Sequence, residues 1–313
     1  MKKARSFCPS TKYRMKTLYI ILTGLLCLLA MSCHVKTQDR KEDAFRLPEI
    51  PSTLVNPEER AAYLSVHYWD HYDFSDTTLI EREDITEQAF VNFLSILPYA
   101  ANAEAAVDTL YRRASVSSAM LYHFIELGDK YLYEPNSPMH NEELHILVLR
   151  ALLANPSLSE SEKERPRYLL EMALKNRPGD KAADFVYTLR NGRKGRLSEV
   201  KSDYLLLYFN DPECEDCREV KQQLTESQPL YGLLSDGRLA VLSVCVEGKT
   251  AAWESAVYPE GWIDAYDEGK QLTRDRVYDL KAMPTLYLLD KEHRVLLKDA
   301  SVGQIEAWLS ERL

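Results

Sequence analysis

The sequence predicts two folded parts, an all-α helical bundle followed by an α/β domain at the end of the chain. From Leu47 to Pro178 the apolar residues recur with the period of a helix, and prolines separate the helical stretches. From about Lys181 the pattern changes to short apolar and β-branched runs, which are typical of strands. We therefore expect a helical domain at 49–178 and an α/β domain at 180–313.

The first helix of the bundle is predicted to begin at Asn56. An asparagine side chain can accept a hydrogen bond from a free amide of the first turn, and Pro57 suits the first helical position. Apolar residues follow the i, i+3, i+4, i+7 spacing most clearly from Leu144 to Ala151. Further helical stretches are expected near 87–97, 103–113, 117–132, 142–154 and 166–175. This half should therefore form a bundle of five or six helices.

The α/β part should begin with a β-hairpin, in which residues 183–189 and 197–200 flank the turn pair Asn191-Gly192. Two long apolar runs, 204–209 and 239–246, are predicted to be strands buried on both faces. The other expected elements are a helix at 218–225, a short helix near 273–280, strands at 286–289 and 295–298, and a closing helix at 302–313. The segment with Trp253 and Trp262 is interpreted as a loop.

The N-terminus has the pattern of an export signal. Residues 1–17 carry six basic side chains and no acidic one, and an apolar run follows from Leu18 to Met31. A basic region, a short apolar stretch and a small residue such as Ser32 are typical of a secretory signal peptide. The apolar run is also shorter than the roughly 20 residues that span a bilayer.

Cys33 follows this signal directly and resembles the lipobox cysteine of bacterial lipoproteins, which is acylated and becomes the mature N-terminus. We therefore expect a lipoprotein signal peptide at 1–32, lipidation of Cys33 and a polar tether at 33–48. The alternative is a plain signal peptide with a free Cys33. His34 replaces the aspartate that retains lipoproteins at the inner membrane in enteric bacteria, which favours the outer membrane.

The composition argues against nucleic acid as a partner. The chain has 48 acidic and 39 basic residues, and the predicted leader would remove six of the basic ones. Nucleic-acid binding instead requires a basic face. Only Cys214, Cys217 and Cys245 lie beyond the leader and the predicted anchor, too few for a fold stabilised by disulfides.

The pair Cys214 and Cys217 has the spacing of a redox site. A thiol at the start of a helix is favoured as thiolate by the positive end of the helix dipole. A second thiol one turn later lies on the same face and can resolve a mixed disulfide. Half of a zinc site is the alternative, but no second C-x-x-C or H-x-x-x-H lies in this half of the sequence. We therefore expect neither a metal nor a cofactor.

A buried strand that leads into C-x-x-C, followed by a proline before a later strand, resembles the thioredoxin-like superfamily. The resemblance is to its exported thioredoxin-like and peroxiredoxin-like branch (the TlpA/ResA type) and covers roughly 181–313. It implies that Cys214 is the attacking thiol and Cys217 the resolving one. It also implies that Pro284 is a cis-proline beside the cysteines and that Met283 and Pro284 bind the substrate.

Some positions depart from the family pattern. Glu213 stands where an aromatic residue usually precedes the first cysteine, and Tyr208 replaces the buried carboxylate of thioredoxin. Lys221 or solvent is then left to handle the proton of the second cysteine. Glu213, Glu215 and Asp216 oppose the helix dipole, which predicts a pair at the reducing end of the potential range.

Three further features carry alternatives. His67 and His71, at i and i+4, could share a metal with Asp73 or Asp76, but we favour an aromatic helix end packed under the bundle. Cys245 is interpreted as a small apolar core residue. The helical half also resembles the domain of unknown function that precedes thioredoxin-like domains in some envelope lipoproteins.

The sequence thus predicts an extracytoplasmic, lipid-anchored thiol–disulfide oxidoreductase that faces the periplasm. We expect a reductase of envelope protein disulfides or peroxidatic thiols, supplied with electrons by a transmembrane donor. The alternative is a non-catalytic adaptor lipoprotein, whose helical domain binds a partner and whose second half is a scaffold.

Overall fold

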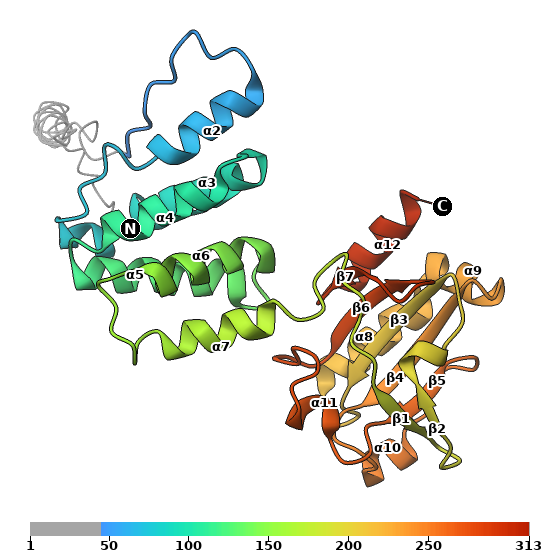
Figure 1. Ribbon diagram of the computed structural model, residues 1–313. Helices are drawn as coiled ribbons and strands as arrows, with labels where there is room; N and C mark the ends of the chain where they lie inside the picture. The colour runs from blue at the N-terminus through green and yellow to red at the C-terminus, as the bar shows by residue number, and fades with distance from the viewer. Residues whose placement is uncertain (1–44, 313) are drawn as a thin grey trace, which may run out of the picture. The chain divides into compact units, whose positions relative to one another are not determined.

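A computed structural model describes residues 45–312 (Figure 1), and the contacts among residues 47–312 group them into one unit. The predicted leader at 1–32, Cys33 and most of the tether lie outside the described residues. Among the described residues, no helix is both long and apolar enough to cross a membrane.

The first half of the unit is helical, as predicted. Its α-helices are α2 (Pro57–His67), α3 (Thr86–Ile96), α4 (Ala103–Ala114), α5 (Ser118–Gly128), α6 (Glu142–Ala154) and α7 (Glu164–Ala173). A π-helical turn, Asp129–Tyr133, continues α5. The Asn56 side chain accepts a hydrogen bond from the Glu58 amide at 2.8 Å, which confirms the predicted start of α2.

The bundle is centred on aromatic side chains that follow α2. Trp69 is 1% exposed, and its ring lies 5.2 Å from Phe124 and 5.7 Å from Phe93 between centroids. Tyr72 and Phe74 are buried against the rings of Trp69 and Phe124. The aromatic members of this segment are therefore core residues of the bundle, as we favoured.

The second half contains a seven-stranded sheet in the order β2-β1-β5-β4-β3-β6-β7. Its strands are β1 (Val186–Leu189), β2 (Lys194–Arg196), β3 (Tyr204–Asn210), β4 (Leu239–Cys245), β5 (Ile263–Tyr266), β6 (Thr285–Asp290) and β7 (Val295–Lys298). Its helices are α8 (Glu215–Glu226), α9 (Gln228–Ser235), α10 (Ala251–Ser255), α11 (Gln271–Arg274) and α12 (Val302–Ser310). β3 and β4 are parallel, whereas β3 and β6 are antiparallel.

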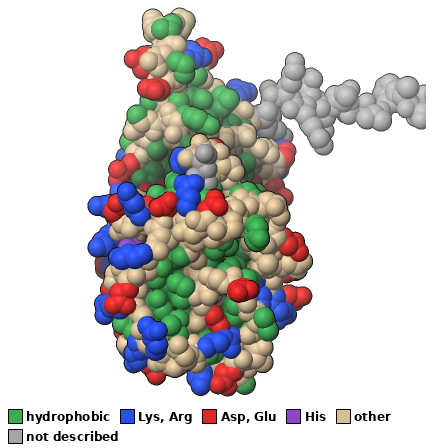
Figure 2. Space-filling view, turned by 90° about the vertical axis from the view of Figure 1, so that its right-hand side faces the viewer, with side chains coloured by type: hydrophobic (Ala, Val, Ile, Leu, Met, Phe, Trp, Pro, Cys, Tyr) green, Lys and Arg blue, Asp and Glu red, His purple; other side chains and the backbone are tan. Residues whose placement is uncertain are grey.

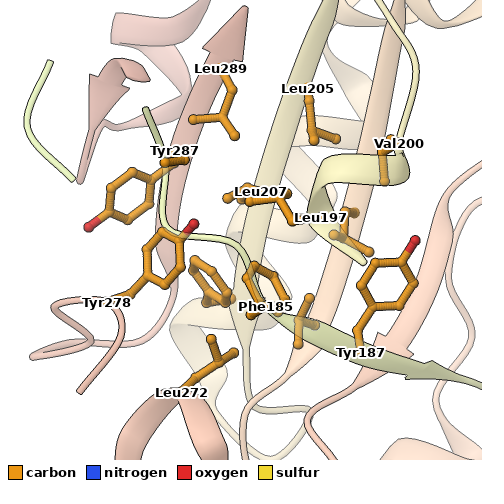
Figure 3. Packing of buried hydrophobic residues seen from close by; sticks show 14 of the residues in the cluster. Phe185, Tyr187, Leu197, Val200, Leu205, Leu207, Leu272, Tyr278, Tyr287 and Leu289 are labelled. Carbon is orange, nitrogen blue, oxygen red and sulfur yellow. The ribbon is translucent and has the colours of Figure 1, made fainter. Parts of the chain in front are cut away.

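Strand β3 is buried on both faces, as the apolar run predicted. Leu206 and Tyr208 pack with residues of α8, α9 and α12 on one side of the sheet. Leu205, Leu207 and Phe209 point to the opposite side, where Figure 3 shows the second apolar core. Alternate residues of an extended strand face opposite sides, so a central strand needs an unbroken apolar run.

Three expectations for this half were wrong. The partner of β1 is Lys194–Arg196, because a tight turn at Asn191-Gly192 pairs Thr188 with Lys194. The expected hairpin strand at 197–200 is instead a 3₁₀ turn, which buries Leu197. The helix expected near 273–280 already ends at Arg274, and Arg276 has a left-handed φ of 51°.

The third error concerns the loop interpretation around Trp253 and Trp262. This segment contains α10 and leads into β5, a central strand that pairs with β4 and β1. Helix α9 was also missed. β5 has only four residues and includes Asp264, so its local pattern is weak and its position depends on the neighbouring strands.

Candidate active site

The two cysteines lie where β3 passes into α8. Cys214 is the N-cap residue of α8, with extended backbone angles of φ −71° and ψ 130°. The Cys217 amide lies 3.4 Å from the Cys214 Sγ, so the exposed start of the helix faces this sulfur. Cys214 is partly exposed, whereas Cys217 is 2% exposed, and both are free thiols. The first sulfur is thus accessible to a partner and the second is shielded.

The loop before β6 lies against the first sulfur. The peptide bond between Met283 and Pro284 is cis, as the resemblance implied. The Cys214 thiol is 3.6 Å from the Met283 carbonyl oxygen. Antiparallel pairing of Phe209 with Thr285 explains this proximity, because it places the end of β3 beside the start of β6. The structure therefore brings Cys214, Cys217, Met283 and Pro284 together, and Cys33 lies outside the described residues.

Burial keeps the second thiol protonated. It raises the pKa of Cys217 to about 12, while the Asp211 amide, 3.4 Å from its sulfur, acts in the opposite direction. The Tyr208 hydroxyl donates a 2.6 Å hydrogen bond to the Cys217 carbonyl oxygen. Burial also raises the pKa of Tyr208, so this phenol is no proton acceptor at neutral pH.

A cavity of about 260 Å³ reaches Cys217 beside α8 and is also lined by Tyr208, Asn210, Lys221 and Tyr258. The Tyr258 hydroxyl donates to the Asn210 Oδ1 at 2.9 Å, and the Asn210 side chain donates to Ser243. The Lys221 ammonium donates to the Val257 carbonyl oxygen at 3.0 Å. A cavity of this size, lined by polar groups, is large enough to hold water beside Cys217.

Sequence reasoning missed the residues that build the far wall of this cavity. Arg190 donates hydrogen bonds to the carbonyl oxygens of Trp253, Glu254 and Ala256 and forms an ion pair with Asp264. Its guanidinium also lies 4.4 Å from the centre of the Trp253 ring. One side chain from the hairpin thus holds the segment that carries Tyr258. No local signal marks Arg190, because its partners are more than 60 residues away in sequence.

The acidic residues beside the cysteines face water. Glu213, Glu215 and Asp216 are all exposed. Arg218 donates to the carbonyl oxygens of Pro212 and Glu213. Solvent screens exposed charges, so each acid acts on the sulfurs only weakly.

Cys245 is fully buried in β4 beside Trp253 and Tyr266, and burial raises its pKa to about 11. It is therefore a core residue, as predicted.

In the helical half, the His67 Nδ1 lies 2.7 Å from the Asp70 carboxylate. Among residues 45–312 no group of three His, Cys, Asp or Glu is arranged to hold a metal ion. On the face shown in Figure 2, basic and acidic side chains are interspersed with apolar ones.

The family model "Domain of unknown function (DUF5106)" matches residues 27–176. A thioredoxin-like protein from Bacteroides caccae has a solved structure with a TM-score of 0.80 and 42% identity, covering 86% of this chain and 99% of that chain. The thioredoxin-like protein YneN of Bacillus subtilis is 28% identical over 132 residues, which are 40% of this chain and 71% of that protein.

A second similar structure is the C-terminal domain of an uncharacterized protein from Bacteroides fragilis, at 38% identity and a TM-score of 0.42, covering 43% of this chain and 98% of that chain. The sheet order, the cysteine pair beside a cis-proline and the match to nearly the whole Bacteroides caccae chain agree with one another. The chain therefore belongs to the thioredoxin-like proteins.

Proposed function

We propose that this protein is an extracytoplasmic thiol–disulfide oxidoreductase in which Cys214 attacks and Cys217 resolves. One observation carries the proposal: an accessible sulfur caps a helix beside the Met283 carbonyl, and a buried, protonated thiol lies one turn behind it. This difference in exposure between the two thiols assigns the attacking role to Cys214 and the resolving role to Cys217.

The reaction needs only the two thiols and a disulfide substrate. The Cys214 thiolate attacks one sulfur of the substrate disulfide, so a mixed disulfide forms and the substrate S–S bond breaks. The departing substrate thiolate takes a proton from water. Cys217 then loses its proton through the cavity and attacks the Cys214 sulfur, which releases the second substrate thiol. Two electrons pass from the pair to the substrate, and Cys214 and Cys217 end as a disulfide.

The proposed partners follow from the sequence. We propose that the protein reduces disulfides of envelope proteins, including those that oxidised peroxidatic cysteines form, while a dithiol donor in the membrane re-reduces the pair. Acylation of Cys33 would hold it at the membrane surface, facing the periplasm, with the outer membrane preferred.

Insulin reduction tests the catalytic proposal. Wild type should reduce insulin, and Cys214→Ser should abolish turnover, because the other two thiols among residues 45–312, Cys217 and Cys245, are buried. Cys217→Ala should accumulate a mixed disulfide with its substrate, since nothing resolves it. Cys245→Ala is the matched control, because it removes a buried thiol that packs with Trp253 and Tyr266 in the core. Equal turnover by wild type and Cys214→Ser would refute the proposal.

One observation favours a second candidate, a non-catalytic adaptor. Tyr208 replaces the carboxylate that accepts the second cysteine's proton in thioredoxin, and its raised pKa prevents it from doing so. In that case the helical half would bind an envelope partner and the cysteines would be dispensable. An insulin assay without turnover, combined with partner binding by Cys214→Ser, would support this candidate.

A further inference from the structure

The segment between α11 and β6, residues 275–284, contains no helix or strand, although it carries Met283. Its shape therefore depends on contacts from elsewhere in the fold. Two come from the turn that follows α7. Lys175 donates to the Arg276 carbonyl oxygen at 2.7 Å, and the buried Asn176 donates to the Val277 carbonyl oxygen at 2.9 Å.

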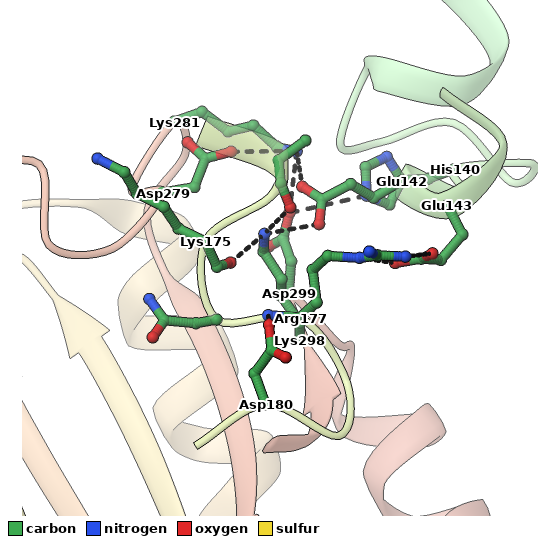
Figure 4. Close-up of polar contacts among 12 residues, drawn as sticks. His140, Glu142, Glu143, Lys175, Arg177, Asp180, Asp279, Lys281, Lys298 and Asp299 are labelled. Carbon is green, nitrogen blue, oxygen red and sulfur yellow. Dashed lines mark hydrogen bonds and ion pairs between the residues drawn. The ribbon is translucent and has the colours of Figure 1, made fainter. Parts of the chain in front are cut away.

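Further along the segment, a second set of contacts holds Lys281. Its side chain is 11% exposed, and its ammonium lies 3.8 Å from Glu142 on α6 and 4.9 Å from the centre of the Tyr133 ring. Asp299 lies 3.4 Å away and Asp279 3.9 Å away (Figure 4). The helical half thus supplies a carboxylate and an aromatic face to a lysine that stands two residues before Met283.

Glu142 also joins the helices to the sheet. Its other oxygen pairs at 2.7 Å with Lys298 of β7, whose side chain is 3% exposed. Lys298 in turn donates to the carbonyl oxygens of Ala173 and Lys175 at the end of α7. The buried Lys298 therefore fixes the position of the Glu142 carboxylate, and Lys281 pairs with a carboxylate that is already held in place.

We propose that the helical half is part of the redox site, because Glu142 and Tyr133 hold Lys281 and thereby position Met283 beside Cys214. Lys281 is then a positioning residue. The substrate of the protein is, on this proposal, a disulfide within a peptide chain. The inference rests on the proposed function. Proline at 284 has no N–H, so the backbone edge of Met283 is available to an incoming strand.

This arrangement predicts a difference between large and small substrates. A peptide disulfide needs both the Cys214 sulfur and a correctly placed Met283 edge. A small aromatic disulfide such as dithiobis(nitrobenzoate) needs only the sulfur. Loosening the segment should therefore weaken peptide binding and leave the reactivity of the thiol itself unchanged.

Neighbouring residues provide a matched test in the full chain. Glu142 forms an ion pair with Lys281, whereas the adjacent Glu143 pairs with Arg177, whose hydrogen bonds and ion pairs are with Glu143 and Asp180 and not with residues 275–284. Lys281→Met and Glu142→Gln should each raise KM for a peptide disulfide at least about fivefold, with kcat nearly constant. Arg177→Met and Glu143→Gln should behave as wild type, and all four variants should react normally with dithiobis(nitrobenzoate).

An unchanged KM in Lys281→Met and Glu142→Gln would overturn the inference. An equal rise in the Arg177→Met and Glu143→Gln controls would do the same, and so would a parallel loss of reactivity toward the small disulfide. Amide hydrogen exchange provides a readout without turnover: residues 276–283 should exchange faster in Lys281→Met than in Arg177→Met. If wild type fails to reduce any disulfide but this exchange difference is found, the proposed function is wrong and the positioning role of Lys281 stands.

Discussion

The Cys214 sulfur lies 3.6 Å from the carbonyl oxygen of Met283, although 69 residues separate them in sequence. The antiparallel pairing of β3 with β6 brings the two residues together. This contact places the accessible thiol beside a backbone edge that an extended peptide can use.

The first prediction concerns pH and stability. Burial raises the pKa of Cys217 to about 12, whereas an unfolded cysteine ionises near 8.5. Above about pH 8.5 the unfolded state therefore releases a proton that the folded state keeps, and the reduced protein should lose up to about 1.4 kcal/mol per pH unit for this group.

Urea unfolding of the reduced protein at pH 7.0, 8.5 and 9.5 measures this dependence. Cys217→Ala should remove part of the slope, while Cys245, whose pKa burial raises to about 11, should retain its own share. Buried tyrosines also contribute near pH 9.5, because an unfolded tyrosine ionises near pH 10, but they contribute equally to wild type and Cys217→Ala, so the difference in slope reports Cys217. An identical slope in wild type and Cys217→Ala would contradict the assignment.

The second prediction concerns the redox potential. The N-terminus of α8 presents the positive end of its dipole to the Cys214 sulfur, and the exposed Glu213, Glu215 and Asp216 place negative charge around the same sulfur. We expect a potential nearer the −270 mV or so of thioredoxin than the roughly −120 mV of DsbA. Replacing Glu215 and Asp216 with Gly and Pro should raise the potential. Equilibration with glutathione measures both values, and no change would show that these carboxylates do not act on the sulfur.

The third prediction is that a chain beginning near Asp180 folds alone and keeps its thiol reactivity. Strand β1 belongs to the sheet, and both apolar cores of the sheet are formed by residues after 180. Without the helices, Lys298 would lose its ion pair with Glu142, but its ammonium would become exposed to solvent. It would therefore not remain as a buried, unpaired charge. A cooperative thermal transition with normal reactivity toward dithiobis(nitrobenzoate) is expected. An insoluble or molten product would show that the helices and the sheet form one folding unit.

The fourth prediction concerns the anchor. If Cys33 is acylated, a fatty-acid analogue should label wild type, and Cys33→Ala should move the protein from membranes to a soluble extracytoplasmic fraction. Cys245→Ala should remain in the membrane fraction. If the fatty-acid analogue does not label the wild-type protein, the predicted lipid anchor at Cys33 is wrong.

The sequence by itself determined much of the fold and the core of the candidate site. The unbroken apolar run at Tyr204–Phe209 predicted a central strand, because only such a strand buries both faces. The spacing of Cys214 and Cys217 predicted the start of a helix, and the resemblance placed Pro284 beside them. These features could be predicted because they depend on patterns of residues that are close together in the sequence.

Tertiary structure decided the remaining features. Strand β5 is too short to be recognised alone, and its pairing with β4 and β1 makes it a strand. The Arg190 contacts around the cavity and the Glu142–Lys281 contact behind Met283 join residues distant in sequence. In the sequence, a charged residue that becomes buried in an ion pair looks the same as one that stays on the surface. Only the folded chain decides which charged side chains are buried and paired.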